Sequence, residues 1–460
     1  MILILTDEER YVPSYDDPSW YSTMTTKQFL EANSIKYTRH YTSSTACTPS
    51  RACLFTGLPV TTHGCTQTPG FYKQDDDPNM VWLSPRFKTM GHHFRSMGYS
   101  TYYVGKWHLT EHATPQEVDK YGFSGWFGPE PHGPDYNKSG IPNDPIYIQE
   151  AIKLLENHPS NIPFLLVLSV VNPHDIVLYT KYKFYGMKLP PTSKPSTVTF
   201  PDHPFEPMAS EPTSHQQYRS LYSKSQLPEA FHLSYHKSNQ EYRNFYHHLL
   251  QHVDNELWIF MNWFLKSKYA NTTYLIYTSD HGDMLGTKGL YQKWYSAYDE
   301  AIRIPLYIYH ASLLSSRIVD FVTSSIDILP TMLSLAGAST TVNITDHICL
   351  SKVVLFETYD DVFNGNSPYP IYIQRFPVLM LFMKRNESMK ASSGKHVKAF
   401  IGYYNGNLWK YIMYHTYGSI IYEQLFNLTT DPEERLNRCV ESKNVVMYLT
   451  SQGSKIASKL

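Results

Sequence analysis

Four short apolar runs constrain the fold of this 460-residue chain most strongly. They comprise residues 2–5, 101–104, 163–171 and 273–277, and each has the length and continuous hydrophobicity of a buried parallel strand. Stretches with helical periodicity lie between them, at residues 90–97, 146–155 and 242–265. This alternation predicts an α/β fold in which helices sandwich a large, mostly parallel sheet.

The alternating pattern ends near Ala338, which predicts a division into two domains. The first comprises residues 1–340, with an irregular insertion at about 178–240 that is rich in Tyr, Pro, Ser and Lys. The second comprises residues 341–460 and contains shorter strand-like runs, for example 399–403. We expect it to be a smaller C-terminal α+β domain.

Composition excludes several classes of partner. The net charge is −1 with 40 basic and 41 acidic residues, so nothing favours nucleic acid or a membrane surface. The longest apolar run, residues 162–171, is about half of a membrane span and contains Pro163. No signal peptide is visible after Met1, so we expect a soluble protein of undetermined compartment. Five cysteines are too few for a disulfide scaffold in a chain of this length.

Acidic, basic and histidine side chains directly follow all four apolar runs. In chain order they are Asp7 and Glu8, then Lys106 and His108, then His174, and finally Asp280 and His281. Ligands of open α/β sheets bind beyond the carboxyl ends of the strands, so we expect these side chains to share one edge. A solvated loop explains any single cluster equally well, whereas four coincident clusters favour a site.

Four of these residues are candidate metal ligands, namely Asp7, Glu8, Asp280 and His281. Carboxylate oxygens suit a hard divalent cation, and calcium is the usual occupant of such sites, with magnesium or manganese as alternatives. The imidazole of His281 would also suit manganese or zinc. Taken alone, the same residues fit two separate loop turns equally well.

Residues 47–57 predict a short helix with a reactive side chain at its start. Pro49 suits the first helical position, and Gly57 ends the segment. Cys47 then lies at the positive end of the helix dipole, and Arg51 lies one turn later, on a face that reaches back toward it. A nucleophile beside a cation suits an anionic substrate. The alternative is a buried structural cysteine, which is the usual role of a free cysteine.

The chain resembles the sulfatase family in motifs that follow the family's order along nearly the whole sequence. These motifs are Thr6-Asp7-Glu8, Cys47-Thr48-Pro49-Ser50-Arg51, Gly105-Lys106-Trp107-His108-Leu109, Pro173-His174, Ser279-Asp280-His281-Gly282, Leu425-Phe426-Asn427-Leu428 and Asp431-Pro432-Glu433. The resemblance implies an alkaline phosphatase-like fold and hydrolysis of a sulfate monoester. The substrate, a small-molecule or carbohydrate sulfate ester, stays open among sugar, aryl and alkyl sulfates.

The resemblance also implies that Cys47 is converted to formylglycine by a formylglycine-generating enzyme. The hydrate of formylglycine would attack sulfur, and a divalent metal would hold a sulfate oxygen. Arg51 would stabilise the oxygen of the hydrate. An unmodified cysteine lacks the second hydroxyl that regenerates the aldehyde and expels sulfate.

Four further residues receive roles from the same resemblance. Lys106 and Lys293 would neutralise charge on the transferring group. His174, with Lys293, would protonate the leaving oxygen. His108 would take the proton from the second hydroxyl of the hydrate. Each of these side chains taken alone would be an ordinary loop or turn residue.

One departure from the family pattern concerns the metal site. The second acidic position is Glu8, where aspartate is commoner, and the extra methylene puts the identity and affinity of the metal in doubt. Two other functions stay open. A phosphonate or phosphate diester hydrolase could use the same modified cysteine, because a tetrahedral anion site does not distinguish sulfur from phosphorus. Glu8 and the Tyr-rich insertion leave open a catalytically silent binding protein with the sulfatase fold.

Overall fold

The computed structural model describes residues 1–12, 19–65, 68, 82–129, 136–179, 211–212, 215–216, 235–293, 296–313, 316–338, 371–375, 395–416 and 419–457. Most of the predicted insertion at 178–240 lies outside the described residues, as do residues 339–370 at the predicted domain boundary.

The larger sheet has eight strands in the order β4-β3-β5-β1-β6-β7-β2-β8. The strands are β1 (Ile2–Asp7), β2 (Ile35–Tyr41), β3 (Ser100–Gly105), β4 (Ser124–Phe127), β5 (Phe164–Pro173), β6 (Leu275–Ser279), β7 (Leu306–Tyr309) and β8 (Arg317–Ser324). The four predicted apolar runs are β3, β5, β1 and β6, which are consecutive parallel neighbours. Only β7 runs antiparallel to its neighbours, so the predicted mostly parallel sheet is confirmed.

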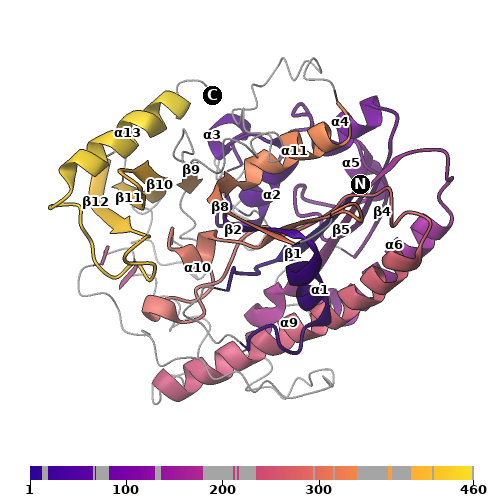
Figure 1. Cartoon of the computed structure of the whole chain (residues 1–460), viewed down its shortest axis with the longest axis horizontal. Helices are drawn as coiled ribbons and strands as arrows, with labels where there is room; N and C mark the ends of the chain where they lie inside the picture. Colours follow the sequence, from indigo (N-terminus) through magenta and orange to yellow (C-terminus); the bar gives the residue numbers. More distant parts are fainter. Residues whose placement is uncertain are drawn as a thin grey trace.

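Helices cover both faces of this sheet (Figure 1). Packed on one face are α1 (Thr25–Asn33), α6 (Gly140–Glu156) and α9 (Tyr235–Lys266), and on the other are α2 (Cys47–Thr56), α4 (Met90–Ser96) and α11 (Ile328–Leu335). Alternate side chains of β1 point to opposite faces of the sheet. Ile2 and Ile4 pack with residues of α1, α6 and α9, whereas Leu3 and Leu5 pack with residues of α2, α4 and α11. All four are fully buried, as expected for a central parallel strand.

Helix α6 begins six residues before the predicted start at residue 146. The backbone N–H groups of Gly140 and Ile141 donate to the two carboxylate oxygens of Asp175, at 3.0 and 2.8 Å. This cap comes from a residue more than 30 positions away in the chain, so local sequence could not reveal it. The remaining short helices are α3 (Val60–His63), α5 (Pro115–Asp119) and α10 (Asp299–Ile302).

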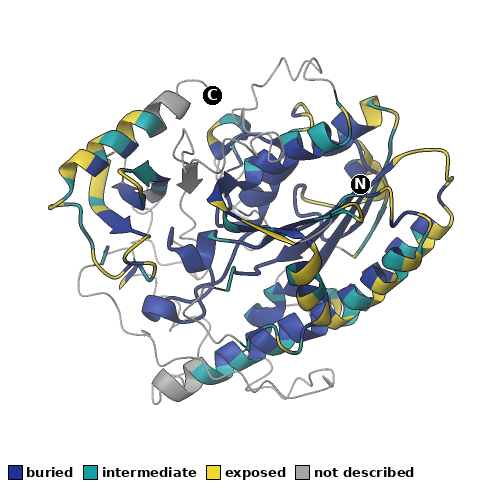
Figure 2. Cartoon of the chain, in the orientation of Figure 1, coloured by how far each residue is buried: buried dark blue, intermediate teal, exposed yellow. Residues whose placement is uncertain are grey.

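A smaller antiparallel sheet of four strands, in the order β12-β11-β10-β9, forms the C-terminal part. Its elements are β9 (Ile371–Arg375), β10 (Lys395–Tyr404), β11 (Asn407–Thr416), β12 (Ser419–Asn427) and helix α13 (Lys443–Ala457). One face of this sheet packs against α13, while the other shares a core with Tyr298 and Ala301 around α10. Figure 2 shows the resulting buried layer between the two sheets. The predicted C-terminal α+β arrangement is confirmed.

Among the helices of the described part of the chain, none is both long enough and apolar enough to cross a membrane.

Candidate active site

Helix α2 presents its first turn to the carboxyl ends of the central strands. It begins at Cys47, two residues before the predicted start, so Pro49 is its third residue. Proline is tolerated there because the first four N–H groups of a helix have no partner within the helix. Gly57 ends the helix in the left-handed conformation, with φ of 67°, as predicted. Cys47 therefore lies in the first turn, and its side chain is 2% exposed.

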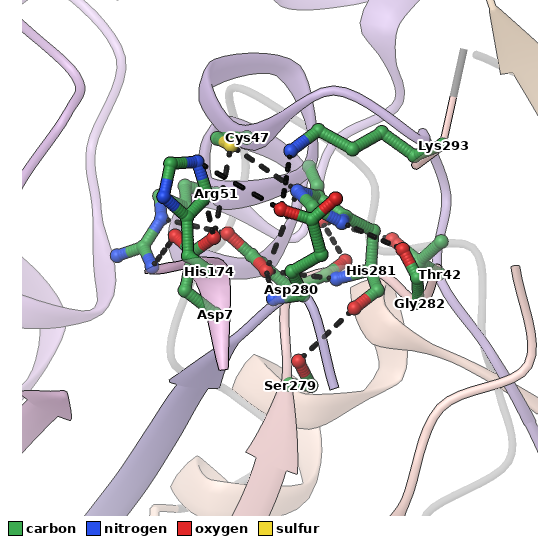
Figure 3. A network of polar contacts seen from close by, with 12 residues as sticks. Asp7, Thr42, Cys47, Arg51, His174, Ser279, Asp280, His281, Gly282 and Lys293 are labelled. Carbon is green, nitrogen blue, oxygen red and sulfur yellow. Dashed lines mark hydrogen bonds and ion pairs between the residues drawn. The ribbon is translucent and has the colours of Figure 1, made fainter. Parts of the chain in front are cut away.

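Four side chains from distant parts of the sequence bring ligand atoms within 4.8 Å of one another: Asp7, Cys47, Asp280 and His281. The Sγ of Cys47 lies 3.1 Å from Nε2 of His281 and 3.9 Å from Oδ1 of Asp7. The Nδ1 of His281 contacts the carbonyl oxygen of Gly282 at 3.1 Å, so Nδ1 carries the proton. The lone pair of Nε2 is therefore free to face the cluster. Figure 3 shows this arrangement at the start of α2.

The chemistry of this cluster fits a divalent cation. Two buried carboxylates and one imidazole nitrogen converge on one point, and buried carboxylates need compensating positive charge. Of the four predicted metal ligands, the structure thus brings together Asp7, Asp280 and His281. Glu8 joins a different group, in which its carboxylate lies near Asp7 and His174.

Arg51 ties the two aspartates together. Its Nη2 donates to Oδ2 of Asp7 at 2.8 Å and its Nε to Oδ2 of Asp280 at 2.9 Å. Its Nη1 donates to the carbonyl of Lys106 at 2.9 Å and to Oγ of Ser169 at 3.0 Å. The expected reach of Arg51 toward Cys47 is thus replaced by contacts that orient carboxylates. All three charged groups of this bridge are fully buried.

Positive charge also controls the ionisation of Asp7. Burial alone would raise the pKa of Asp7, but Lys106, His174 and Arg51 together hold that pKa well below its usual range. The Nζ of Lys106 lies 2.5 Å from Oδ2 of Asp7 and 3.9 Å from Sγ of Cys47. Burial and the Asp7 carboxylate raise the pKa of the Cys47 thiol to about 12. The thiol is therefore neutral near pH 7.

Glu8 forms an ion pair with Lys293 beside the ligand cluster. Its Oε2 lies 2.8 Å from Nζ of Lys293, and its backbone has a φ of 69°. The backbone N–H of Glu8 donates to Oδ1 of Asp280 at 3.1 Å, and the hydroxyl of Tyr246 donates to its carbonyl at 2.7 Å. Burial raises the pKa of Glu8 to about 8, with Asp283 adding to the rise and Lys293 opposing it.

The two remaining predicted residues lie at the margins of the cluster. The Nε2 of His174 is 3.8 Å from Glu8 Oε2 and 4.0 Å from Asp7 Oδ1, and the side chain is 13% exposed. Burial, reinforced by the charge of Lys106, lowers the pKa of His174 well below its usual value. His108 is joined to α2 through its carbonyl, which accepts a hydrogen bond of 2.9 Å from Thr48.

The sequence interpretation missed residues that support the site. Ser169 lies inside the apolar run that forms β5, where a serine drew no attention, yet it binds Arg51. Ser50 donates to the carbonyl of Asp280 at 2.5 Å. Asp283 raises the pKa of Glu8. Its position directly after the Ser279-Asp280-His281-Gly282 motif could have indicated a place near the site.

Carboxylates, histidines and lysines gather at the start of α2 in a cluster that could hold a metal ion, and comparison with known proteins gives the family. The family model described as sulfatase matches residues 1–338. The chain belongs to the sulfatase family. It is 30% identical over 345 residues to the uncharacterised sulfatase YidJ of Escherichia coli, covering 67% of this chain and 61% of that protein. It is 25% identical over 441 residues to arylsulfatase K of Mus musculus, covering 92% of this chain and 72% of that protein. The chain thus spans less than two thirds of the length of YidJ.

Solved structures of sulfatases share the fold. The structure of a 2-O GAG sulfatase superposes with a TM-score of 0.73 at 18% identity, covering 100% of this chain and 92% of that chain. The phosphonate monoester hydrolase of Silicibacter pomeroyi superposes with a TM-score of 0.65 at 15% identity, covering 99% and 94%. The alkaline phosphatase-like fold expected of the family is therefore present.

Proposed function

We propose that this protein hydrolyses a sulfate monoester, using formylglycine formed from Cys47 and a divalent metal ion. One observation carries the proposal. The first turn of α2 places Cys47 among the ligand atoms of Asp7, Asp280 and His281, with the ammonium group of Lys106 3.9 Å from its sulfur. A tetrahedral anion bound there would meet positive charge among buried side chains.

Asp7, Asp280 and His281 are the residues that would hold the cation, calcium in this proposal. The ion would supply positive charge to a sulfate oxygen and favour the ionised form of the nucleophile. Arg51 orients both carboxylates through two of its four hydrogen bonds, one to Oδ2 of each aspartate. Oδ1 of Asp280 then lies 3.6 Å from Nε2 of His281. Preorganised ligands of this kind do not have to rearrange when the ion binds.

Conversion of Cys47 to formylglycine, by a formylglycine-generating enzyme, would supply a hydrated aldehyde with one hydroxyl to attack sulfur and one to release sulfate. Lys106 and Lys293 would neutralise charge on the sulfate group. His174, with Lys293, would protonate the leaving oxygen, and the negative charge of a bound sulfate ester would favour the protonated imidazole that burial disfavours. His108, fixed to α2 through Thr48, would accept the proton of the second hydroxyl.

A second candidate function is hydrolysis of a phosphonate or phosphate diester. It is supported by the shared fold of the phosphonate monoester hydrolase and by a site that suits any tetrahedral anion. A catalytically silent binding protein is the third candidate, and the ion pair that occupies Glu8 favours it.

The deciding experiment combines mass spectrometry with turnover. Protein produced with a formylglycine-generating enzyme should contain a Cys47 peptide about 18 Da lighter than the unmodified peptide. It should hydrolyse an aryl sulfate faster than an aryl phosphodiester, and the matched variant Cys47→Ala should hydrolyse neither. A preference for the phosphodiester would favour the second candidate. Complete modification without turnover of either ester would favour the silent binding protein.

A further inference from the structure

Lys410 on β11 is a fully buried lysine of the C-terminal sheet that reaches into the neighbouring α/β part of the chain. Its Nζ lies 2.5 Å from Oδ1 of Asp299 and 2.7 Å from Oε1 of Glu434. It also donates a hydrogen bond of 3.1 Å to the carbonyl of Ala297. The ammonium group thus has three close partners, and two of them, Ala297 and Asp299, belong to the segment that leads into and begins α10.

Glu434 completes the same contact from the segment after β12. Its Oε2 accepts the backbone N–H of Asp299 at 2.7 Å, and Asp299 is the first residue of α10. Arg303 lies 3.3 Å from the other oxygen of Asp299. The cluster therefore pairs two acids with two bases, which is the condition under which buried charges are tolerated. Glu434 directly follows the Asp431-Pro432-Glu433 motif, to which the proposed function assigns no role.

The anchored segment is the one that carries Lys293. On one side of Lys293, the carbonyl of Gln292 accepts the N–H of Met284 at 2.7 Å. On the other side, Lys410 and Glu434 fix Ala297 and Asp299. The side chain of Lys293 reaches into the candidate site, where its Nζ lies 2.8 Å from Oε2 of Glu8. Figure 1 places α10 between the C-terminal sheet and the larger sheet, where this connection runs.

We propose that Lys410 and Glu434 are positioning residues, through which the C-terminal sheet sets the location of Lys293 in the active site. The inference rests on the proposed function, in which Lys293 neutralises the sulfate group. A displacement of about 1 Å at a charge-neutralising group can lower a rate about 100-fold, so an anchor four to six residues away affects turnover without touching substrate. The cluster thus gives the C-terminal motif a physical role.

The test is a double-mutant cycle between the anchor and Lys293. Lys410→Met keeps the length of the side chain and removes its charge, and we expect kcat/KM to fall about 10- to 100-fold. In a Lys293→Met background, the same change should cost little more, because the group that it misplaces is already absent. Lys398→Met is the matched control, since Lys398 lies half-buried on β10 of the same sheet and should leave kcat/KM unchanged.

A second variant and a second readout keep the test independent of folding and of activity. Glu434→Gln preserves shape and removes one charge, and it should show the same lack of additivity with Lys293→Met. Hydrogen exchange at residues 296–302 should become faster in both anchor variants and stay unchanged in Lys398→Met.

Three outcomes would overturn the inference. In the first, the kcat/KM losses of Lys410→Met and Lys293→Met multiply in the double variant. In the second, hydrogen exchange at residues 296–302 is unchanged in the anchor variants. In the third, Lys293→Met keeps full activity. If the unaltered protein hydrolyses no sulfate ester, the proposed function fails. Faster exchange would then still establish the anchor, and unchanged exchange would refute it.

Discussion

Arg51 and Asp280 form an ion pair in which neither side chain is exposed to solvent, with Nε of Arg51 2.9 Å from Oδ2 of Asp280. The same guanidinium also holds Asp7. A planar guanidinium directs its donors along fixed directions to the two carboxylates, whereas a lysine offers a single point charge on a flexible chain. Arg51 therefore holds in place the two aspartates of the proposed metal site.

The first prediction concerns this bridge. Arg51→Met leaves two buried carboxylates without their shared partner, so the free energy of unfolding of the metal-free protein should fall by about 3–5 kcal/mol. Urea unfolding measures the change. Arg95→Met is the control, because Arg95 also lies 2.8 Å from its aspartate but both side chains are substantially exposed. That pair should contribute about 1 kcal/mol or less, and equal losses in the two variants would contradict the assigned role of Arg51.

The second prediction concerns metal removal. A chelator should abolish hydrolysis and lower the melting temperature, since an ion at about 100 times its dissociation constant stabilises the fold by about 2.7 kcal/mol. Calcium should restore both properties, and calorimetric titration with calcium, magnesium and manganese would identify the preferred ion. His281→Ala removes a neutral ligand and should weaken the binding of the ion. Unchanged affinity in this variant would argue against His281 as a ligand.

The third prediction uses the close approach of β3 to β5. Gly105 has a φ of 100°, and a Cβ atom at this position would lie 2.0 Å from the carbonyl oxygen of Ser169. Gly105→Ala must therefore shift the backbone immediately before Lys106, and we expect a loss of stability of about 3 kcal/mol or more together with reduced turnover. Gly125→Ala separates the two effects, because Gly125 also has a positive φ but no atom within 4 Å of the added group. Its loss should be only about 1 kcal/mol, and equal losses would show that the contact with Ser169 is unimportant.

The fourth prediction concerns the pH dependence of stability and His40, a buried histidine to which the proposed function assigns no role. Burial lowers the pKa of His40 from 6.5 to about 3, so the folded protein keeps this side chain neutral while the unfolded chain takes up a proton below about pH 6.5. The stability contribution is fully present above that pH and is lost as the pH falls toward 3. Between pH 8 and pH 5 this single group should lower the free energy of unfolding by about 2 kcal/mol.

His40→Gln should remove that part of the pH dependence, which urea unfolding at a series of pH values measures directly. The exposed residue His112 provides the control, since His112→Gln should leave the slope unchanged. An unaltered slope in His40→Gln would show that another group governs the acid sensitivity.

The sequence predicted the side chains of the site better than their contacts. The polar residues after four apolar runs indicated one site because β3, β5, β1 and β6 are parallel, and these strands are adjacent in the sheet. The pairing of Arg51 with Asp280 joins residues 229 positions apart. It depends on the order of strands in space, which hydrophobic periodicity does not contain.

Glu8 illustrates the same limit at the level of one side chain. Its charge suggested a metal ligand, which stays a prediction, and its carboxylate lies near the carboxylate of Asp7 and the imidazole of His174. Its ion pair with Lys293 joins residues 285 positions apart, which the local sequence does not reveal. Lys410 drew no attention in the sequence because a lysine in a strand is usually solvated. Only the packing of the two sheets shows that it is buried between acids.

The long sequence distance between Cys47 and the residues that surround it matters during translation. The sulfur contacts His281, 234 residues further along, and only then is its pocket complete. At a synthesis rate of about 5–20 residues per second, the nascent chain presents Cys47 without that neighbour for about 10–50 s. In the folded protein the same side chain is 2% exposed. The enzyme that we propose to modify Cys47 would therefore have to reach this residue before the fold encloses it.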